Sequence, residues 1–303
     1  MEYVLQTDSL KKSYKSFQAL EGLTLNIPKG SVYGFVGRNG AGKTTLIRLI
    51  CGLQKPTAGS FTLFGVSSAS SDIVRSRRRM GAVVETPAVY MDMTAEDNLR
   101  QQYLILGLPS CDGIPSLLEL VGLGDTGRKK VRDFSFGMKQ RLGIALALAG
   151  DPDFIVLDEP ANGLDPQGIV ELRELILRLN REKGITFLIS SHNLDELSRL
   201  ATHYGIIDHG RMVKELSAEE LAAACRKCVR MEVSDTSVLA RVLDGMGIEY
   251  KLISNKVADV YAKVSVTKLT VALADENCEV VSMQENDESL ESYFISLVGG
   301  GEQ

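Results

Sequence analysis

Residues 37–44 read GRNGAGKT and fit the phosphate-binding pattern G-x-x-x-x-G-K-[ST] at every position. The glycines of this segment let the backbone curl until its N–H groups point at phosphate oxygens. Lys43 would place its ammonium on the β- and γ-phosphates, and Thr44 would offer a hydroxyl to Mg²⁺. The apolar run 31–36 predicts a buried strand before the loop, and 44–52 predicts a helix whose N-terminus faces the phosphates. We expect the nucleotide to be bound by Gly37, Asn39, Gly40, Ala41, Gly42, Lys43, Thr44 and Thr45.

The composition excludes several classes of protein. A net charge of -5 and a pI near 5.4 argue against a general nucleic-acid binder, and the basic stretch 75–79 predicts a solvated face. The chain contains no apolar run of about 18 residues or more, so we expect no membrane span. The N-terminus lacks the pattern of a signal peptide, and the five cysteines are scattered, which together predict reduced thiols in a cytosolic protein.

Two domains are predicted from the pattern along the 303 residues. Residues 1–217 alternate strand-like and helix-like segments, which predicts an α/β domain with a largely parallel sheet. Its N-terminal strands and 60–64 should form an antiparallel layer, and about 86–150 should form a helical subdomain. Residues 218–303 predict a small accessory α+β domain with a disordered tail.

Helix start signals strengthen this assignment. Thr94 precedes Asp97, and Asn193 precedes Glu196, at the spacing of a capping box. We therefore expect helices to begin at these two points.

The segment 154–160, FIVLDEP, supplies the second half of the phosphate site. Four apolar residues predict a buried strand that delivers Asp158 and Glu159 to its carboxyl end, where ligands bind in open α/β sheets. Asp158 is placed to hold Mg²⁺, directly or through water, and Glu159 could polarise the attacking water as a general base. A further apolar strand, 185–190, leads to His192, whose imidazole we expect near the γ-phosphate.

The most specific motif is FSFGM at 134–138, followed by KQRLGIALAL. With the phosphate loop and the acidic strand, it resembles the ATP-binding cassette ATPases, the nucleotide-binding subunits of ABC transporters, over residues 3–216. The segment is similar to the family signature LSGGQ, with Ser135 and Gly137 at the Ser and Gly positions and with Phe134, Phe136 and Met138 departing from it. The resemblance implies that this motif closes over the γ-phosphate held by a partner subunit. Function then requires a head-to-tail dimer of this chain or of this chain with a homologous ATPase.

The same resemblance implies roles for two further residues. Tyr14 lies ahead of the phosphate loop and looks like the aromatic residue that stacks on adenine. Asp165 lies in NGLDP at 162–166, which resembles the loop that contacts the partner subunit.

Glu85 departs from the family pattern, which has Gln in the loop after this strand. A glutamate adds a negative charge and a hard oxygen ligand beside the metal, so we expect Glu85 to act on Mg²⁺ and on the attacking water. With the Pro-x-x-Tyr that follows, the Glu variant resembles the subfamily that serves bacteriocin and peptide-antibiotic exporters, including lantibiotic immunity and bacitracin-type resistance.

The resemblance implies a Mg²⁺-dependent ATPase with ATP and Mg²⁺ as cofactors, Glu159 as the base, His192 as the γ-phosphate sensor and Lys43 as a catalytic cation. Thr44, Glu85 and Asp158 are the expected metal residues. The partners would be a separate membrane permease, which would hold the chain on the inner face of the plasma membrane, and a second ATPase subunit, without nucleic acid. Two alternatives stay open. One is an importer ATPase with a C-terminal regulatory domain, and the other is a soluble ABC ATPase that acts on ribosomes or DNA.

Overall fold

The computed structural model describes residues 2–225, 228–261, 266–286 and 290–299. The chain divides into two compact units, Met1–Ala218 and Glu219–Gln303. The pattern of the sequence predicted this boundary between residues 217 and 218.

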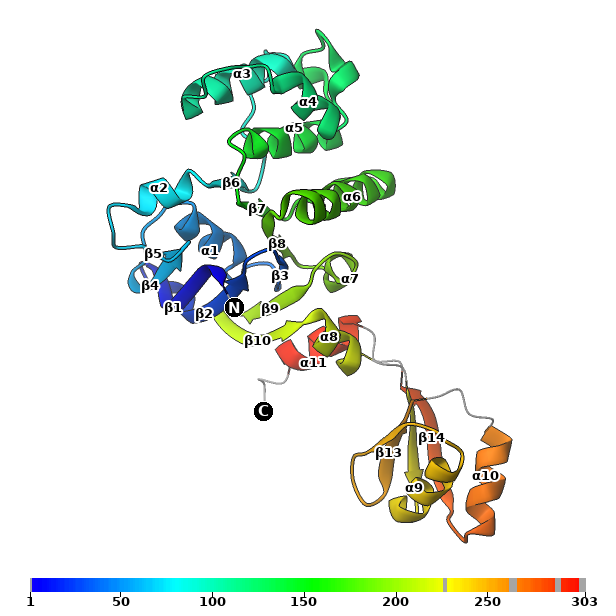
Figure 1. Ribbon diagram of the computed structural model, residues 1–303. Helices are drawn as coiled ribbons and strands as arrows, with labels where there is room; N and C mark the ends of the chain where they lie inside the picture. The colour runs from blue at the N-terminus through cyan, green and yellow to red at the C-terminus, as the bar shows by residue number, and fades with distance from the viewer. Residues whose placement is uncertain (1, 226–227, 262–265, 287–289, 300–303) are drawn as a thin grey trace. The chain divides into compact units, whose positions relative to one another are not determined.

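A six-stranded sheet forms the centre of the first unit, in the order β10-β9-β3-β8-β7-β6 (Figure 1). The strands β9, β3, β8, β7 and β6 pair in parallel, and only β10 is antiparallel to its neighbour. The predicted, largely parallel sheet is confirmed. Its strands are β3 (Val32–Val36), β6 (Met80–Val83), β7 (Phe154–Asp158), β8 (Thr186–Ser191), β9 (His203–Asp208) and β10 (Arg211–Ser217).

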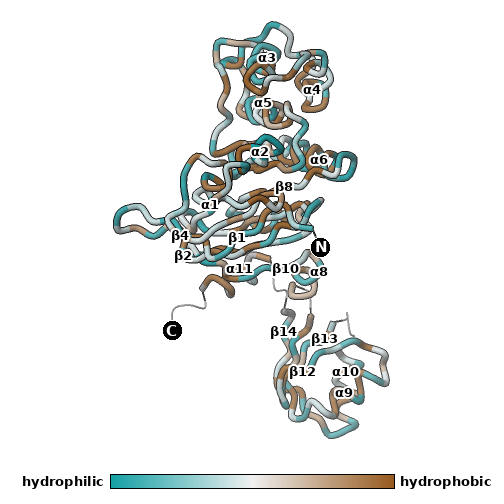
Figure 2. Tube along the Cα trace, turned by 60° about the vertical axis from the view of Figure 1, so that its left-hand side comes forward, coloured by the Kyte–Doolittle hydropathy of each residue, from teal (hydrophilic) through white to brown (hydrophobic). Residues whose placement is uncertain are grey.

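A second, antiparallel sheet has the order β2-β1-β4-β5, which confirms the predicted antiparallel layer. Its strands are β1 (Tyr3–Tyr14), β2 (Phe17–Pro28), β4 (Ala58–Leu63) and β5 (Val66–Ser67). Helix α1 (Lys43–Ile50) shares one hydrophobic core with strands of both sheets, because Leu46 and Ile50 pack in a cluster with Leu25 and Phe154. Figure 2 shows brown, hydrophobic stretches of the trace along the strands of these sheets. The packing fixes α1 rigidly behind the phosphate loop.

Three helices form a cluster at one end of the unit (Figure 1). They are α3 (Ala95–Leu106), α4 (Ile114–Leu120) and α5 (Phe136–Leu148), with two short 3₁₀ turns, η1 (Gly124–Thr126) and η2 (Val131–Asp133). The N-terminus of α3 carries the predicted capping box, since the Thr94 hydroxyl accepts a hydrogen bond from the Asp97 amide and the Asp97 carboxylate accepts one from the Thr94 amide.

The remaining helices of the unit are α2 (Ile73–Arg77), α6 (Pro166–Lys183) and α7 (Leu194–Ser198). Within the basic stretch 75–79, Arg77 departs from the predicted solvated face. Its guanidinium donates to the carbonyl of Ile50 at 2.9 Å and lies 6.0 Å from the centre of the Phe61 ring. Arg77 therefore satisfies a carbonyl at the C-terminus of α1, while Arg75, Arg78 and Arg79 are exposed.

The second unit contains a four-stranded antiparallel sheet in the order β12-β13-β11-β14. Along the chain its elements run strand, helix, strand, strand, helix, strand, which is the split βαβ arrangement. Both helices contribute to one apolar core, with Leu239 and Leu243 from one and Leu269 and Leu273 from the other. The elements are α8 (Ala218–Ala224), β11 (Cys228–Val233), α9 (Thr236–Gly245), β12 (Tyr250–Leu252), β13 (Val257–Val260), α10 (Val266–Asp275), β14 (Val280–Asn286) and α11 (Leu290–Gly299).

The predicted disordered tail starts inside α11, and residues 300–303 lie outside the described residues. Among the helices of the described residues, none combines the length and the apolar character needed to cross a bilayer.

Candidate active site

The phosphate loop connects β3 to α1. Gly42 has φ +110°, and a Cβ there would lie 2.7 Å from the carbonyl oxygen of Ala19. A Cβ at Gly37 would lie 2.6 Å from the carbonyl oxygen of Ile207. Side chains at these two positions would collide with neighbouring backbone, so the sequence needs glycine to bring the loop close to β9 and β2. We expect the loop amides and the N-terminus of α1 to attract an anion together.

Lys43 lies at the start of α1 and is 5% exposed, so its charge needs partners. Its Nζ lies 3.0 Å from Oε1 of Glu159 and donates to the carbonyls of Gly37 at 2.6 Å and Arg38 at 3.2 Å. The other carboxylate oxygen of Glu159 lies 2.8 Å from Nδ1 of His192. The structure therefore brings together the loop lysine, the acid after β7 and the histidine after β8, which are far apart in sequence.

The backbone after β7 is held in an unusual conformation. Glu159 has φ +47°, in the left-handed region that residues other than glycine seldom occupy. Its amide donates to the hydroxyl of Ser190 at 2.9 Å, and the same hydroxyl donates to Oδ1 of Asp158 at 2.6 Å. Ser190 thus ties both acids to β8, and sequence reasoning missed it. The available signal was a hydroxyl residue at the end of a neighbouring apolar strand.

Asp158 tests whether a metal fits here. It is 1% exposed, and its Oδ2 is buried with no hydrogen-bond partner. An unpartnered buried carboxylate oxygen is costly, and a hard cation such as Mg²⁺ would satisfy it. Within the described ranges, no group of three or more His, Cys, Asp or Glu side chains is placed so that it could hold a metal ion by itself. Mg²⁺ commonly completes its shell with water and substrate phosphates, which suits a site made of one carboxylate and the Thr44 hydroxyl.

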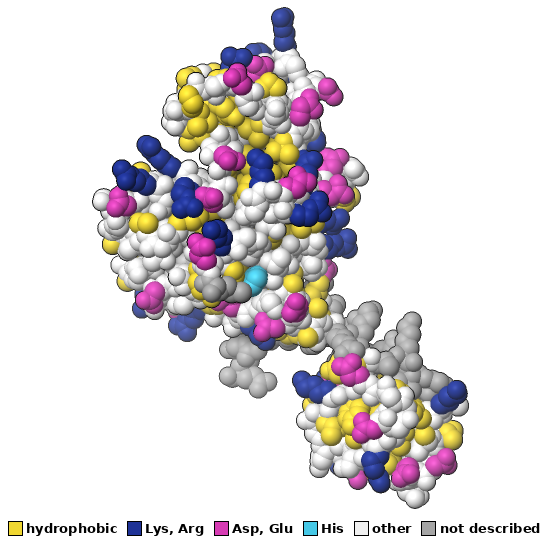
Figure 3. Space-filling model, in the orientation of Figure 1, with side chains coloured by type: hydrophobic (Ala, Val, Ile, Leu, Met, Phe, Trp, Pro, Cys, Tyr) yellow, Lys and Arg dark blue, Asp and Glu magenta, His cyan; other side chains and the backbone are white. Residues whose placement is uncertain are grey.

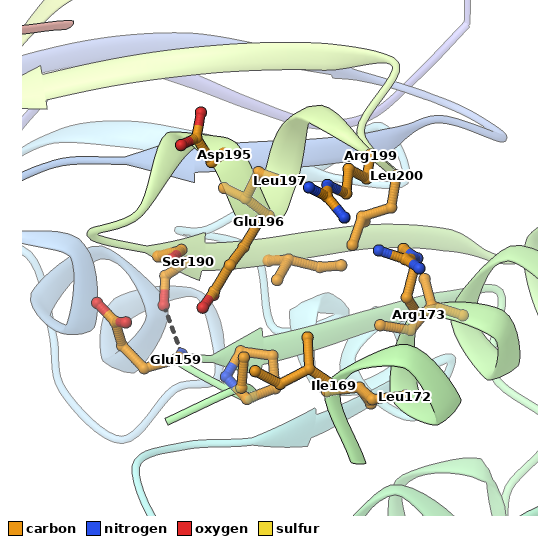
Figure 4. A pocket seen from close by; sticks show the side chains of 15 residues that line it. Glu159, Ile169, Leu172, Arg173, Ser190, Asp195, Glu196, Leu197, Arg199 and Leu200 are labelled. Atoms are coloured by element: carbon orange, nitrogen blue, oxygen red, sulfur yellow. Dashed lines mark hydrogen bonds between the residues drawn. The ribbon is translucent and has the colours of Figure 1, made fainter. Parts of the chain in front are cut away.

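A cavity of about 140 Å³ opens beside Glu159, between α6, β8 and α7 (Figure 4). Its walls are mainly apolar, with Ile169 and Leu172 among them, but Glu196 from α7 points its carboxylate toward the end where Glu159 and Ser190 lie. Burial raises the pKa of Glu196, the charge of His192 opposes that rise, and the charge of Glu159 adds to it. The cavity therefore places a second titratable acid beside the candidate base.

The predicted capping box at Asn193 forms only in part. The Asn193 side chain accepts hydrogen bonds from the amides of Asp195 at 2.9 Å and Glu196 at 3.3 Å. The side chain of Glu196 lines the cavity beside Glu159, so the spacing identified the helix start correctly while the glutamate serves another environment.

The signature residues gather at a different place. Ser135 is the N-cap of α5 and accepts a hydrogen bond from the Met138 amide at 3.2 Å. Asp165 is the N-cap of α6 and accepts one from the Gly168 amide at 2.9 Å. Ser135, Gly137 and Asp165 line one cavity of about 350 Å³ that does not include the phosphate loop. The N-termini of α5 and α6 thus face one cavity, and the phosphate loop at the N-terminus of α1 lies outside it. Two separate surfaces of this kind are what a head-to-tail dimer requires.

Two further predicted residues contact α1 or the residues that flank it in space. Tyr14 ends β1, with its hydroxyl bonded to Gln54 and the ammonium of Lys12 5.1 Å from the centre of its ring. Glu85 follows β6 and pairs with Arg48 on α1. The roles of Tyr14 with adenine and of Glu85 with Mg²⁺ stay predictions.

Comparisons with known proteins show what this chain is similar to. The sequence profile described as "ABC transporter" matches residues 20–162. The bacitracin transport ATP-binding protein BcrA of Bacillus licheniformis is 39% identical, covering 99% of this chain and 99% of its own length. The lantibiotic transport ATP-binding protein SrtF of Streptococcus pyogenes is 42% identical over 70% of this chain and 90% of its own. A solved dimeric bacterial ABC transporter cassette aligns with TM-score 0.65 and 25% identity, covering 71% of this chain and 98% of its own.

Proposed function

The chain belongs to the family of ABC transporter ATP-binding subunits, and we propose that it powers a separate membrane permease that exports peptide antibiotics or related hydrophobic compounds. The observation that carries this proposal is the convergence of Lys43, Glu159 and His192 beside the unpartnered oxygen of Asp158. The likeness to the bacitracin transport protein extends over both units, which favours an exporter over an importer or a ribosome- or DNA-directed ATPase. The substrate class rests on the names of these relatives.

The ion pair between Lys43 and Glu159 suggests how the site prepares for ATP. With 6% and 19% of their side chains exposed, both groups depend on each other for charge compensation. The β- and γ-phosphates of ATP would compete for Lys43, because the loop amides and the helix N-terminus attract them to the same place. The Glu159 carboxylate would then lose its ion pair with Lys43 and contact the attacking water.

Hydrolysis follows from this exchange. Glu159 accepts a proton from the water as the water oxygen attacks the γ-phosphorus, and the bond to the β-phosphate oxygen breaks. His192 keeps the second carboxylate oxygen of Glu159 oriented and reports on the γ-phosphate. Mg²⁺, held by Thr44 and Asp158 with Glu85 nearby, would neutralise charge on the phosphates. Tyr14 would stack on adenine, and Ser135, Gly137 and Asp165 would close on the nucleotide of a second ATPase subunit.

A groove on the helical side suits the permease. It has a volume of about 420 Å³ and is lined largely by apolar residues of β6, of the loop 84–88 and of α3 and α5. Leu104 and Ile105 of α3 are about 70% exposed, and they directly precede Leu106, which lines the groove. Figure 3 shows hydrophobic side chains gathered over these helices. Exposed apolar surface of this kind marks a protein interface. We propose that the permease docks here and holds the chain on the inner face of the plasma membrane.

The decisive variant is Glu159→Gln, which keeps the size of the side chain and removes the base. We expect it to bind ATP, to hydrolyse it about 100- to 1,000-fold more slowly, and to accumulate as an ATP-bound dimer. Glu182→Gln, on the exposed side of α6, is the matched control and should behave like the native chain. Rapid steady-state hydrolysis by Glu159→Gln would sink the assignment of the base.

The same variant identifies the partner. A tagged Glu159→Gln chain is isolated with ATP from detergent-solubilised native membranes and its partners are read by mass spectrometry. A polytopic permease in near-stoichiometric amount is the expected result. Recovery with ribosomal proteins or DNA, and without a permease, would overturn the transporter proposal.

A further inference from the structure

An ion pair joins the helix behind the phosphate loop to the loop that lines the permease groove. Arg48 lies in the last turn of α1, and its Nη2 contacts Oε1 of Glu85, which follows β6. Thr44 and Arg48 are one helical turn apart, so they lie on the same face of α1. The partner of Glu85 is therefore about one turn along the helix from the residue expected to hold Mg²⁺.

The pair contributes little to stability. The side chains of Arg48 and Glu85 are 35% and 57% exposed, and water screens the attraction between charges that are this exposed. The contact is consequently easy to exchange for another. Glu85 also has φ +61°, a left-handed backbone that persists only when the surroundings specify it.

The loop around Glu85 reaches the groove directly. Thr86, Pro87 and Ala88 line it together with Gly143 of α5, and a Cβ at Gly143 would lie 2.7 Å from Cβ of Pro87. A movement of this loop therefore alters the surface proposed for the permease.

We propose that Arg48 is a positioning residue for Glu85. Arg48 holds the Glu85 carboxylate on α1 in the absence of nucleotide and gives it up when Mg²⁺ and ATP bind, so the strength of this pair sets how much Mg²⁺ is needed. The inference rests on the proposed function, and specifically on the expected role of Glu85.

The first measurement is nucleotide binding as a function of Mg²⁺, made in the Glu159→Gln background so that hydrolysis does not interfere. Binding of a fluorescent ATP analogue is titrated with Mg²⁺. Arg48→Gln should lower the Mg²⁺ concentration for half-maximal binding about three- to fivefold, because a competitor for the carboxylate is removed. Arg48→Lys keeps a positive charge and should stay close to the native value.

A double-mutant cycle separates an effect through Glu85 from an effect of charge alone. Glu85→Gln should raise the Mg²⁺ requirement, and Arg48→Gln added to it should change nothing further. If Arg48→Gln has the same effect with and without Glu85, Arg48 acts by its own charge and the inference is wrong. If Glu85→Gln leaves the Mg²⁺ requirement unchanged, the inference is also overturned, whereas the ATPase assignment, tested by Glu159→Gln, is unaffected.

A second readout needs no metal. Hydrogen exchange of the nucleotide-free chain should become faster in residues 83–90 when Arg48 is replaced by Gln. The swapped pair Arg48→Glu with Glu85→Arg should restore the native exchange rate while the Mg²⁺ requirement stays raised. Fast exchange in the swapped chain, with the rest of the unit exchanging normally, would show that the pair does not hold the loop.

Discussion

The two units of this chain both build a sheet with helices, but they place polar side chains very differently. In the first unit β3, β7 and β8 run in parallel, so their carboxyl ends meet at one edge and bring Lys43, Glu159 and His192 together. In the second unit every strand pair is antiparallel. The carboxyl ends of neighbouring strands therefore lie at opposite edges of this sheet and do not meet at one place.

The two units also differ in where their charged pairs lie. Arg230 of β11 lies directly opposite Asp259 of β13, within the sheet, and the two form a bidentate contact at 2.7 and 2.8 Å. Lys43 and Glu159 instead come from a loop–helix junction and a strand end. We therefore expect the Lys43–Glu159 pair to be exchanged during a reaction cycle, whereas the Arg230–Asp259 pair is part of the frame of the second unit.

The largest expected effect comes from removing the ammonium of Lys43 in the first unit. Lys43→Met should weaken ATP binding and reduce hydrolysis about 100- to 1,000-fold, because one preorganised charge on the transferred phosphate is lost. Hydrolysis and nucleotide affinity are measured beside Lys183→Met, an exposed lysine of α6. Equal losses in both variants would mean that the strand-end cluster is not the site.

A smaller effect is expected from Ser190→Ala. The change removes the hydroxyl that donates to Asp158 and accepts from the Glu159 amide, so both acids become less well positioned. We expect the free energy of unfolding to fall by about 1–3 kcal/mol and hydrolysis to fall about tenfold. Ser191→Ala is the matched control, since the Ser191 hydroxyl accepts from the Asn193 amide. An unchanged hydrolysis rate in Ser190→Ala would show that this tie to β8 is dispensable.

The smallest effect is expected in the second unit. Asp259→Asn should reduce the stability of the β11–β13 pair by about 1–2 kcal/mol, because 9% of the Asp259 side chain but 48% of the Arg230 side chain is exposed. Hydrogen exchange in residues 228–233 and 257–260 of the full chain should become faster, with ATP hydrolysis unchanged. Glu276→Gln, which breaks the exposed pair with Arg241, should have almost no effect.

The pH dependence sharpens this prediction. The hydrogen bonds and charge of Arg230 hold the pKa of Asp259 below its ordinary value. A depressed carboxyl pKa contributes stability above the ordinary pKa, and that contribution is lost as the pH falls through the folded-state value. The difference in exchange between the native chain and Asp259→Asn should be full at neutral pH and shrink below about pH 4. A difference that persists at low pH would mean that the pair is not the cause.

Much of the first unit could be predicted because its signals are local. The phosphate loop, the strand before the two acids and the capping box at Thr94 each lie within a few consecutive residues, and each follows from backbone geometry or hydrogen bonding at short range. The parallel sheet and the antiparallel layer also followed from the order of the elements. The roles of the individual site residues stay predictions.

Other features were beyond the reach of a local pattern. Arg77 reads as one more solvated cation but bonds to the end of α1, and Glu196 reads as a capping residue but lines the cavity beside Glu159. In both cases a distant element supplies the partner. The order in which the strands of the second unit pair, β12-β13-β11-β14, was not predicted either, because short strands pair according to long-range packing rather than to their own sequence.

The sequence by itself determined the phosphate loop, the two acids after a buried strand, and the class of fold, since these depend on residue type and spacing along one segment. Only the tertiary structure decided that Lys43 forms an ion pair with Glu159 and Arg48 with Glu85. The same holds for the hydrogen bonds of the Ser190 hydroxyl with Asp158 and with the Glu159 amide. These contacts join residues 31 or more positions apart in the chain. Such residues meet only when strand order and core packing bring their elements side by side, and that order is a property of the whole folded unit.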